Sequence, residues 1–416
     1  MSAADASKDP AVGSKVPSNM MGEFYSFIRN LGSFTGDLSA LTCPSFLLNG
    51  DSLLEYLTHW GDQPALLAQI PKESASEERM VAVCRWFIST LYGSYYVRSA
   101  ASNEKKPFNP ILGEQFLGHW DTENEGTTFL TCEQVSHHPP ISAFFLENES
   151  AGIFANGHTG QKSKFTGTTI KITQTGFATV HLTNSDEQFT ICLPDLYIRS
   201  LLTGKPFMEV VGNTWIQSSK GYTAVIQFQA KPWFGGEYHR FKGSIYSHDP
   251  EFTGDPLTLG SKSSSSNHSN RSANATELYT MEGRWMAKST VTHVPTKKTK
   301  ALFDATTKKP VPIHVLPVSE QGPLESRRVW HGVSHAINSG DYSKASAQKS
   351  VLENEQRRKR KKRTENNHSW SPNYFTFVRE ARLVGCRSTR HLDSYTAEEH
   401  GRWVFNRVLD KLTTEN

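Results

Sequence analysis

Tyr222-Thr223-Ala224-Val225-Ile226-Gln227-Phe228-Gln229 alternates with a period of two, and both faces of this stretch carry apolar side chains. Successive side chains of an extended chain point to opposite faces, so the period predicts a β-strand. Similar patterns recur between about 112 and 286. Further candidate strands are Thr127–Thr131, Ser142–Leu146, Thr168–Thr173, Ala178–Thr183, Gln188–Cys192, Phe241–Tyr246 and Leu278–Met286. Many short strands joined by Gly, Asn and Asp turns predict an antiparallel meander.

A meander of this length has exposed edges unless it curls or splits. A large barrel removes the edges and encloses space that a small barrel fills with side chains. We therefore expect a mainly β fold with flanking α-helices, in which a closed or incomplete antiparallel β-barrel of about 112–286 surrounds an apolar tunnel. The low-complexity run 261–275 cannot bury a core face, which predicts a flexible surface loop within the same domain.

Helical spacing precedes the strands. Between about 50 and 98, Leu53–Trp60 and Glu77–Tyr96 predict two helices. Met20–Phe34 has a broad apolar face that includes Phe24, Phe27, Ile28 and Leu31. Its polar face is thin, so this short helix must cover something apolar. A second helical part is expected near the end of the domain, over about 323–363.

Composition excludes several classes of protein. Hydrophobic residues make up 37% of the 416 residues, and no apolar run approaches the ~18 to 20 residues of a membrane span. Residues 1–19 are small and polar, which predicts a disordered N-terminus without a secretory signal and a cytoplasmic location. The five cysteines are scattered and contain no CxxC pair, so neither a disulfide framework nor a structural zinc site is expected.

Positive charge is concentrated in one place. The run Arg357–Arg363 carries seven positive charges, more than the net charge of +4, so the rest of the chain is net acidic. Such a run fits a solvated helix face, a surface for anionic membranes or phosphate, or a nuclear signal. No RNA-recognition motif, helix-turn-helix spacing or zinc-finger pattern accompanies it, so no nucleic-acid partner is expected.

Two adjacent histidines precede two prolines in Glu133-Gln134-Val135-Ser136-His137-His138-Pro139-Pro140. Proline fixes its own φ and pushes the preceding residue toward extended backbone. His137 and His138 are therefore expected at a strand end or tight turn, as a rigid polar display that suits an anionic group.

Two further segments carry polar side chains in a defined arrangement. In Lys105–Glu114, prolines at 107 and 110 stiffen a turn that presents Lys106 and Asn109. Lys349, Glu353 and Arg357 follow at i, i+4 and i+8, which aligns them on one stripe of a helix. A carboxylate between two cations also fits a merely stabilised helix face, so this pattern alone leaves both interpretations open.

An enzyme is the competing interpretation. Consecutive side chains on an extended segment tend to point apart, whereas strand and helix metal sites use i, i+2 or i, i+4 histidines, so a metal site at the histidine pair is not expected. The chain has no Gly-x-Ser-x-Gly elbow, P-loop, Gly-x-Gly-x-x-Gly or His-Glu-x-x-His. We therefore expect a protein that is not an enzyme and has no cofactor.

The EQVSHHPP run and the KPFNPILGE turn resemble the signatures of the oxysterol-binding protein family. The likeness spans roughly Phe24–Arg363 and includes Trp86–Leu91 and Pro323–Arg327, which leaves 364–416 as a C-terminal extension. The chain is similar to short fungal members that consist of the lipid-binding domain alone, since it lacks a pleckstrin-homology module, ankyrin repeats and a two-phenylalanine acidic-tract motif. The resemblance implies a soluble, monomeric lipid carrier whose barrel is closed by a lid at about 20–34.

The resemblance also implies residue roles. The phosphoinositide head group would bind Lys106, Asn109, His137, His138, Lys349, Glu353 and Arg357. Candidate tunnel residues are Trp60, Ser94, Tyr95 and Gln174, and candidate lid residues are Phe24, Phe27, Ile28 and Leu31.

The expected activity is exchange of sterol and phosphatidylinositol 4-phosphate between membranes, with peripheral and transient binding to anionic surfaces. Two alternatives stay open. The counter-cargo could be phosphatidylserine, or the protein could be a phosphoinositide or sterol sensor that regulates membrane traffic through a protein partner.

Overall fold

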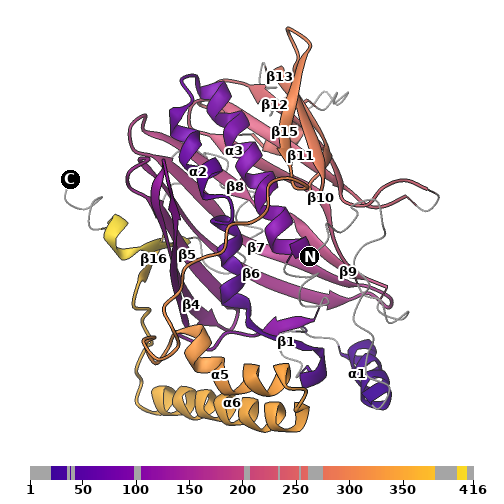
Figure 1. The fold of residues 1–416 in the computed structure, drawn as a ribbon, viewed down its shortest axis with the longest axis vertical. Coiled ribbons are helices and arrows are strands. Elements are labelled where there is room, and N and C mark those ends of the chain that lie inside the picture. Colours follow the sequence, from indigo (N-terminus) through magenta and orange to yellow (C-terminus); the bar gives the residue numbers. More distant parts are fainter. Residues whose placement is uncertain are drawn as a thin grey trace.

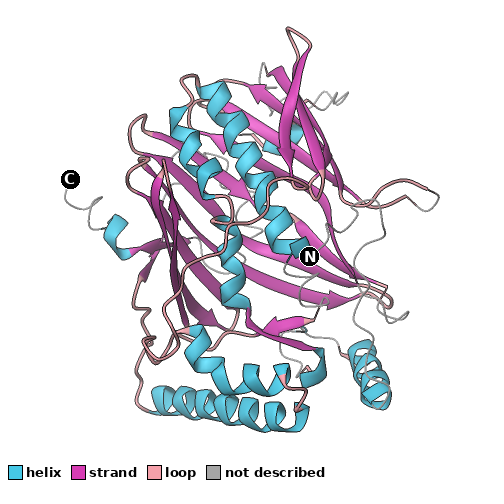
Figure 2. Ribbon diagram, in the orientation of Figure 1, coloured by secondary structure: helices cyan, strands magenta, loops and turns pink. Residues whose placement is uncertain are grey.

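The computed structural model describes residues 20–34, 38, 43–97, 105–200, 207–232, 235–252, 254–260, 275–379 and 401–409. The predicted disordered N-terminus and, apart from its last residue, the predicted loop at 261–275 lie outside the described residues. Within them, a 13-stranded antiparallel sheet curls around helices that pack on its concave side (Figures 1 and 2). The mainly β fold with flanking helices is confirmed.

The strands of this sheet follow one another in chain order almost throughout, as the meander predicts. Their hydrogen-bonded order is β15-β14-β13-β12-β11-β10-β8-β7-β6-β5-β4-β3, and β9 pairs with both β10 and β7. The strands are β3 (Gln115–Thr122), β4 (Gly126–His137), β5 (Pro140–Asn148), β6 (Ile153–Phe165), β7 (Ile170–Leu182), β8 (Glu187–Cys192), β9 (Asp195–Arg199), β10 (Phe207–Ser218), β11 (Tyr222–Gln229), β12 (Arg240–Ser247), β13 (Thr276–Arg284), β14 (Lys288–His293) and β15 (Lys298–Asp304).

The predicted strand bounds need two corrections. The sheet continues past 286 to Asp304, because β14 and β15 form a further hairpin. The two strands predicted at 168–173 and 178–183 are one strand, β7. Gly176, between the two predicted strands, lies inside β7 with φ of 95°, and a Cβ there would be 2.2 Å from the His158 carbonyl oxygen of β6. Glycine is needed at this position for close backbone approach rather than for a turn.

The barrel is incomplete, because β3 and β15 are not paired with each other. The chain that follows β15 instead returns along the free edge of β3. His119 and His314 exchange backbone hydrogen bonds of 3.0 and 2.8 Å, and the Gln115 amide donates to the Leu324 carbonyl at 2.9 Å. This segment covers an edge that would otherwise present unpaired backbone groups.

Five helical elements occupy the concave face of the sheet. They are η4 (Leu53–Trp60), α2 (Pro64–Gln69), η5 (Ile70–Lys72), α3 (Ser76–Leu91) and a π-helical continuation at Tyr92–Val97. The two predicted helices correspond to η4 and to α3 with its continuation, and α2 is an additional short helix that begins with proline at its first position. Trp86, Phe87 and Ile88 of α3 are at most 1% exposed and join the central apolar core. Burial of these large side chains against the strands is the main stabilising term of the fold.

The remaining elements lie around one end and one side of the sheet (Figure 1). They are α1 (Met21–Ser33), the parallel pair β1 (Leu48–Ser52) and β2 (Lys106–Phe108), α5 (Ser326–Asn338), α6 (Tyr342–Glu365), and the hairpin of β16 (Phe375–Arg379) and β17 (Gly401–Phe405). The predicted helices at 20–34 and 323–363 are present. No helix in the described ranges is both long and apolar enough to cross a bilayer.

Candidate functional site

Strand β2 begins at Lys106, and Asn109 follows its last residue. Both residues are exposed, and the Lys106 ammonium donates to the Asn109 Oδ1 at 2.6 Å. Neighbouring groups crowd the end of the Lys106 side chain, and this loss of solvation around the ammonium lowers its pKa; the like charge of Lys349 lowers it further. The turn therefore holds a cation and an amide side by side, directed away from the core.

Buried Glu114 fixes this turn from beneath. Its carboxylate is fully buried and accepts from the Ile111 amide at 2.9 Å, the Ser326 hydroxyl at 2.7 Å and the Trp330 indole at 2.9 Å. It also accepts from Ser52. Burial raises the pKa of Glu114, and these four hydrogen bonds oppose that rise. One carboxylate thus ties the turn to α5 and to the end of β1.

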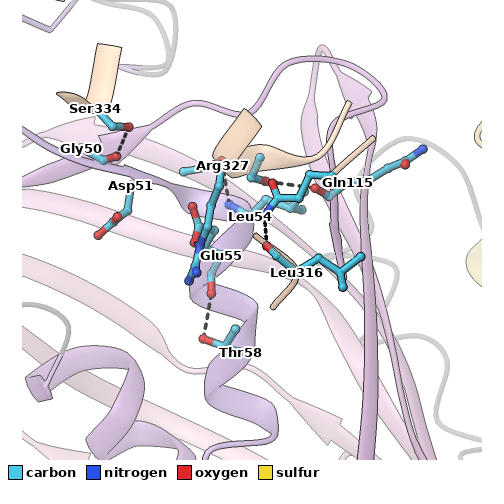
Figure 3. Close-up of polar contacts among 12 residues, drawn as sticks. Gly50, Asp51, Leu54, Glu55, Thr58, Gln115, Leu316, Arg327 and Ser334 are labelled. Carbon is cyan, nitrogen blue, oxygen red and sulfur yellow. Dashed lines mark hydrogen bonds and ion pairs between the residues drawn. The ribbon is translucent and has the colours of Figure 1, made fainter. Parts of the chain in front are cut away.

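A second set of contacts docks α5 beside this turn. Figure 3 shows Arg327 directed toward Glu55 of η4, with Nε 2.8 Å from the carboxylate, and Ser334 donating to the Gly50 carbonyl at 2.5 Å. Because α6 follows α5 directly, these contacts also set where α6 begins.

The histidine pair lies where β4 ends. His137 is the last residue of the strand and His138 is in the turn to β5, as predicted from the prolines. Their rings are 4.7 Å apart and nearly edge to face. The expectation that the two side chains point apart is wrong, because strand alternation stops at His137 and the turn brings the next ring back.

Among the residues that the structure describes, Nδ1 of His137 finds no hydrogen-bond partner. His137 forms a hydrogen bond with the Pro110 carbonyl of the first turn, whereas its buried Nδ1 is unpartnered. Loss of solvation lowers the pKa of His137, and the neighbouring His138 adds to this. A buried ring nitrogen without a partner is costly unless a ligand or water binds it.

The third set lies on α6 as the helical spacing predicts. Glu353 forms ion pairs with Lys349 and with Arg357, the second at 3.7 Å between Nη2 and Oε2. Arg357 also donates to the Asn354 side chain at 2.7 Å. The helix therefore carries an internally paired stripe, which agrees with the stabilised-face interpretation when α6 is considered alone.

Contacts bring the three segments together. The Gly113 amide donates to the Gln134 carbonyl at 3.0 Å, which joins the Lys106 turn to the histidine strand, and Lys105 Nζ lies 5.8 Å from the Tyr342 ring at the start of α6. The Glu353 carboxylate of α6 opposes the lowering of the pKa of Lys106 and of His137 by loss of solvation, which agrees with this arrangement. We call Lys106, Asn109, His137, His138, Lys349, Glu353 and Arg357 the cationic cluster.

Sequence reasoning missed two neighbours of this cluster. Arg360 was assigned only to the basic run, although its i+7 spacing from Glu353 places it on the same helix face. Cys43 packs close enough to Lys106 and Lys349 for both cations to influence the pKa of its thiol, which burial raises. No motif marks Cys43.

A second group of polar side chains lies inside the fold. Gln174 of β7 is 5% exposed, and its amide donates to the Tyr95 hydroxyl at 2.9 Å and to the Pro194 carbonyl at 2.7 Å. Burial raises the pKa of Tyr95 to about 12, against the effect of hydrogen bonds with Gln174 and Ser94. We call Ser94, Tyr95 and Gln174 the interior polar cluster.

Trp60, the fourth predicted tunnel residue, has different neighbours. It is 2% exposed and stacks on Phe144 with ring centroids 5.0 Å apart, and Trp86 is 5.5 Å away. The Trp86 indole donates to the Trp60 carbonyl at 3.1 Å. These contacts are those of a packed core residue, and a role for Trp60 in ligand contact stays a prediction.

Two residues that sequence reasoning missed lie beside the interior polar cluster. The fully buried Trp285 ring meets Tyr95 edge to face at 6.4 Å, and His239 lies 4.6 Å from Trp285. The indole nitrogen of Trp285 and Nδ1 of His239 have no partner. Burial lowers the pKa of His239 to about 4, so the ring is neutral near pH 7.

The apolar face of α1 is directed toward the protein. Leu31 is 2% exposed, and Phe24, Phe27 and Ile28 are half-buried. The opposite face carries Tyr25 at 62% exposure. These exposures confirm the predicted amphipathic helix, while its movement as a lid stays a prediction.

Within the described ranges, no group of three or more His, Cys, Asp or Glu side chains is arranged to hold a metal ion.

Comparison with known proteins agrees with the motifs. A family model described as Oxysterol-binding protein matches residues 23–408. Protein KES1 of Mycosarcoma maydis is 39% identical over 358 residues, which span 84% of this chain and 86% of the relative. The family match runs beyond Arg363, where the recognised motifs end, and includes the β16–β17 hairpin.

Two solved structures share the fold. The Osh1 ORD domain in complex with cholesterol superposes with a TM-score of 0.68 at 21% identity, covering 96% of this chain and 89% of that chain. The Osh3 ORD in complex with PI(4)P from Saccharomyces cerevisiae gives a TM-score of 0.63 at 23% identity, covering 94% and 97%.

Proposed function

The chain belongs to the oxysterol-binding protein family, and we propose that it is an intracellular lipid-transfer protein that extracts a sterol and phosphatidylinositol 4-phosphate and exchanges them between membranes. The fold is shared with one domain in complex with cholesterol and another in complex with PI(4)P, which supports both ligand classes.

The observation that carries the phosphoinositide assignment is the convergence of three distant segments on one exposed cluster. Within it, Lys106 and Asn109 would bind phosphate or inositol hydroxyls, and the histidines would donate to the 4-phosphate. Arginine and lysine form charge-assisted hydrogen bonds to phosphate, which are shorter and stronger than neutral ones. The unpartnered Nδ1 of His137 is a group for which such a ligand supplies the missing partner.

On α6, the ion pairs of Glu353 give the cluster a means of adapting to a ligand. Lys349 and Arg357 are held beside one carboxylate in the free protein. A phosphate group can replace that carboxylate as their partner, and Glu353 can then accept from inositol hydroxyls.

The interior polar cluster suits the neutral end of a sterol. Tyr95 and Gln174 are uncharged near pH 7 and already hydrogen-bonded, so they can orient one hydroxyl group without burying a charge. Ser94 and Trp60 would contribute to the surrounding wall. The tunnel would thus be apolar with a few convergent polar groups, as small-molecule sites commonly are.

The proposed exchange uses α1 as a lid. Its half-buried aromatic face would cover the cargo, and burial at roughly 25 cal/mol per Å2 of apolar surface would retain it. A bilayer offers the lipid a similar apolar environment, so the net affinity is a small difference and release at another membrane stays feasible. The phosphoinositide, competing for the same protein, would give exchange its direction.

Membrane docking would use the end of the molecule at which α1 and α6 both lie (Figure 1). Arg358–Lys362 are exposed along the last turns of α6. Basic residues near an anionic leaflet contribute about 1 kcal/mol each, and pairing of Arg358 with Glu355 at 2.8 Å reduces that contribution here.

The experiment that tests the function is native mass spectrometry with lipid extraction after incubation with liposomes. The liposomes contain sterol, phosphatidylserine and phosphatidylinositol 4-phosphate. We expect one phosphoinositide per protein, displaced by sterol. Displacement by phosphatidylserine instead would identify a phosphatidylserine exchanger. A protein that extracts none of these lipids would contradict transfer and favour a sensor that acts through a protein partner.

A matched variant ties the result to the cationic cluster. In His137→Ala/His138→Ala, phosphoinositide extraction should be lost while sterol uptake persists. Loss of both activities in a folded variant would contradict separate sites for head group and sterol.

A further inference from the structure

The chain that follows α6 returns to both signature segments. Helix α6 ends at Glu365, where the Asn366 amide donates to the Lys362 carbonyl at 3.1 Å and the His368 amide donates to the Arg363 carbonyl at 2.9 Å. Residues 366–375 then run from α6 to the start of β16. We call residues 366–375 the strap.

Glu133 holds one end of the strap. This fully buried carboxylate lies in β4, four residues before His137. Its two oxygens accept hydrogen bonds of 2.8 Å from the successive backbone amides of Asn373 and Tyr374. Bonds to an ionised acceptor are roughly twice as strong as neutral ones. Both carboxylate oxygens of Glu133, the glutamate of the histidine motif, are therefore hydrogen-bonded to the protein's own backbone.

Trp370 in the middle of the strap covers the other signature turn. Gly113 has φ of 80°, and a Cβ there would lie 3.3 Å from Cζ2 of the Trp370 indole. The Gly113 amide donates to the Gln134 carbonyl at 3.0 Å, and the Gln134 amide donates to the Glu114 carbonyl at 2.8 Å. The strap thus packs where the Lys106 turn and the histidine strand are joined.

The hairpin after the strap anchors it to the outer side of the sheet. Phe375 is 1% exposed in an apolar cluster with Val135, Ala143 and Phe145. Asn156 of β6 bonds the hairpin twice, donating to the Trp403 carbonyl at 2.7 Å and accepting from the Phe405 amide at 2.9 Å. These contacts give the strap a fixed far end.

Helix α6 needs such support at its C-terminal half. Ala345, near its start, is the one fully buried residue of the helix, and Arg357–Lys362 are all exposed. Leu352 also packs against the apolar cluster of α5, so packing fixes α6 as far as Leu352 but not the turns that carry Arg357 and Arg360. Those turns depend on where the chain goes next.

We propose that the strap positions the cationic cluster, with Glu133 as the positioning residue that holds it against the histidine strand. This inference rests on the proposed function. The strap is covalently continuous with α6, bonded to the histidine strand and packed on the Lys106 turn. It therefore sets the distance between the three segments that bind the head group.

The test uses Glu133→Gln in the full chain, measured against dioctanoyl phosphatidylinositol 4-phosphate and, separately, a fluorescent sterol. The amide keeps the shape of the carboxylate but replaces one acceptor with a donor that faces a backbone N–H. We expect phosphoinositide affinity to fall about tenfold, since hydrogen bonds to a charged acceptor are stronger than neutral ones, while sterol affinity stays within about twofold.

Glu187→Gln is the matched control. Glu187 is also a fully buried carboxylate, and it accepts from Arg79 at 2.6 Å and from Ser218 at 2.5 Å, on α3 and β10 rather than in the cluster. The control should lose stability without changing the ratio of phosphoinositide to sterol affinity. If both variants change that ratio equally, or Glu133→Gln lowers both affinities together, the role of Glu133 is only structural and the proposal is overturned.

Trp370→Ala provides a second variant on the strap itself, should Glu133→Gln fail to fold. It should reproduce the selective loss of phosphoinositide binding. Unchanged phosphoinositide affinity in this variant would overturn the proposal.

Amide hydrogen exchange separates failure of the strap from failure of the proposed function. In either strap variant, amides of 353–365 should exchange faster than in the wild type, and Glu187→Gln should leave them unchanged. If the wild type binds no phosphoinositide, the proposed function fails. The exchange result then tests the strap by itself. Unchanged protection of the amides of 353–365 in the strap variants would contradict the proposal that the strap positions α6.

Discussion

The cationic cluster and the interior polar cluster lie in opposite physical environments. The first is at the surface and combines side chains from a turn, a strand end and a helix. The second is buried and consists of neighbouring groups, with Gln174 and Tyr95 joined by a 2.9 Å hydrogen bond. The first carries formal charges, whereas the second is neutral near pH 7.

The difference follows from the cost of burying charge. An isolated ion loses its hydration in the interior and must be paired or neutralised, whereas a neutral hydroxyl or amide needs only a hydrogen bond. A charged head group is therefore best bound at the surface and an uncharged sterol inside. Four experiments test this division.

Charge reversal at Lys106 should have the largest effect. Lys106→Glu replaces the cation that we propose binds phosphate with a carboxylate near Glu353. We expect phosphoinositide affinity to fall about 100-fold, since one charged hydrogen bond contributes roughly 1.5–3 kcal/mol and repulsion adds to its loss. Titration with dioctanoyl phosphatidylinositol 4-phosphate measures this, with Lys72→Glu, a surface lysine paired with Glu125, as the control. An equal loss of sterol binding would show that the two clusters are not separate sites for head group and sterol.

Neutralisation of the basic run should affect docking rather than recognition. Replacing Arg358–Arg363 with glutamine should slow lipid transfer to anionic liposomes by about tenfold at low salt, because each cation near the surface contributes about 1 kcal/mol and several are already paired with glutamates. Stopped-flow transfer assays measure the rate as a function of salt. Arg360 also influences His137, so a second variant should keep Arg360. A transfer rate that does not change at low salt would assign the run to another role.

Removal of one interior hydroxyl should affect the sterol alone. Tyr95→Phe keeps the ring and its contact with Trp285 while deleting the acceptor of the Gln174 bond. A neutral hydrogen bond contributes about 0.5–1.5 kcal/mol, so sterol affinity should fall about fivefold. Fluorescent sterol binding measures this. Phosphoinositide affinity that falls by the same factor would show that the two clusters act as one site.

The pH dependence of binding should be the smallest effect. Loss of solvation lowers the pKa of His137, so its ring is neutral near pH 7. A bound phosphate raises that pKa, and the complex takes up protons relative to the free protein. Phosphoinositide affinity should therefore rise about two- to threefold as pH falls from 7.5 to 6.5, until protonation of the phosphate itself opposes the gain. Calorimetry measures the slope, which should flatten in His137→Gln. Sterol affinity should stay constant, and a sterol affinity that varied as strongly would contradict this division.

The sequence predicted the cationic cluster better than the interior cluster, and the reason is local. Its members occur in short segments with prolines or helical spacing, which constrain backbone direction without tertiary contacts. Tyr95 and Gln174 are 79 residues apart with no local pattern to relate them. They were candidates only through family resemblance, and Trp285 and His239 beside them were missed entirely.

In the fold too, segments with a regular pattern were predicted, whereas positions that depart from the pattern were not. Period-two alternation identified the meander, because it depends only on neighbours in the chain. It failed at Gly176, where a positive φ lies inside a strand, and beyond 286, where β14 and β15 carry many polar residues. Strand alternation also predicted that the side chains of His137 and His138 point apart. That prediction is wrong because the chain turns after His137.

Short-range spacing in the sequence was enough to predict the β meander, the amphipathic α1, the helical stripe of α6 and the family. Which segments meet depends on the tertiary structure. It placed Glu353 near both Lys106 and His137, and it gave Glu133 the backbone amides of Asn373 and Tyr374 as partners. Glu133 and Tyr374 are 241 residues apart, and contact at such a distance follows from the packing of the whole sheet rather than from any local preference.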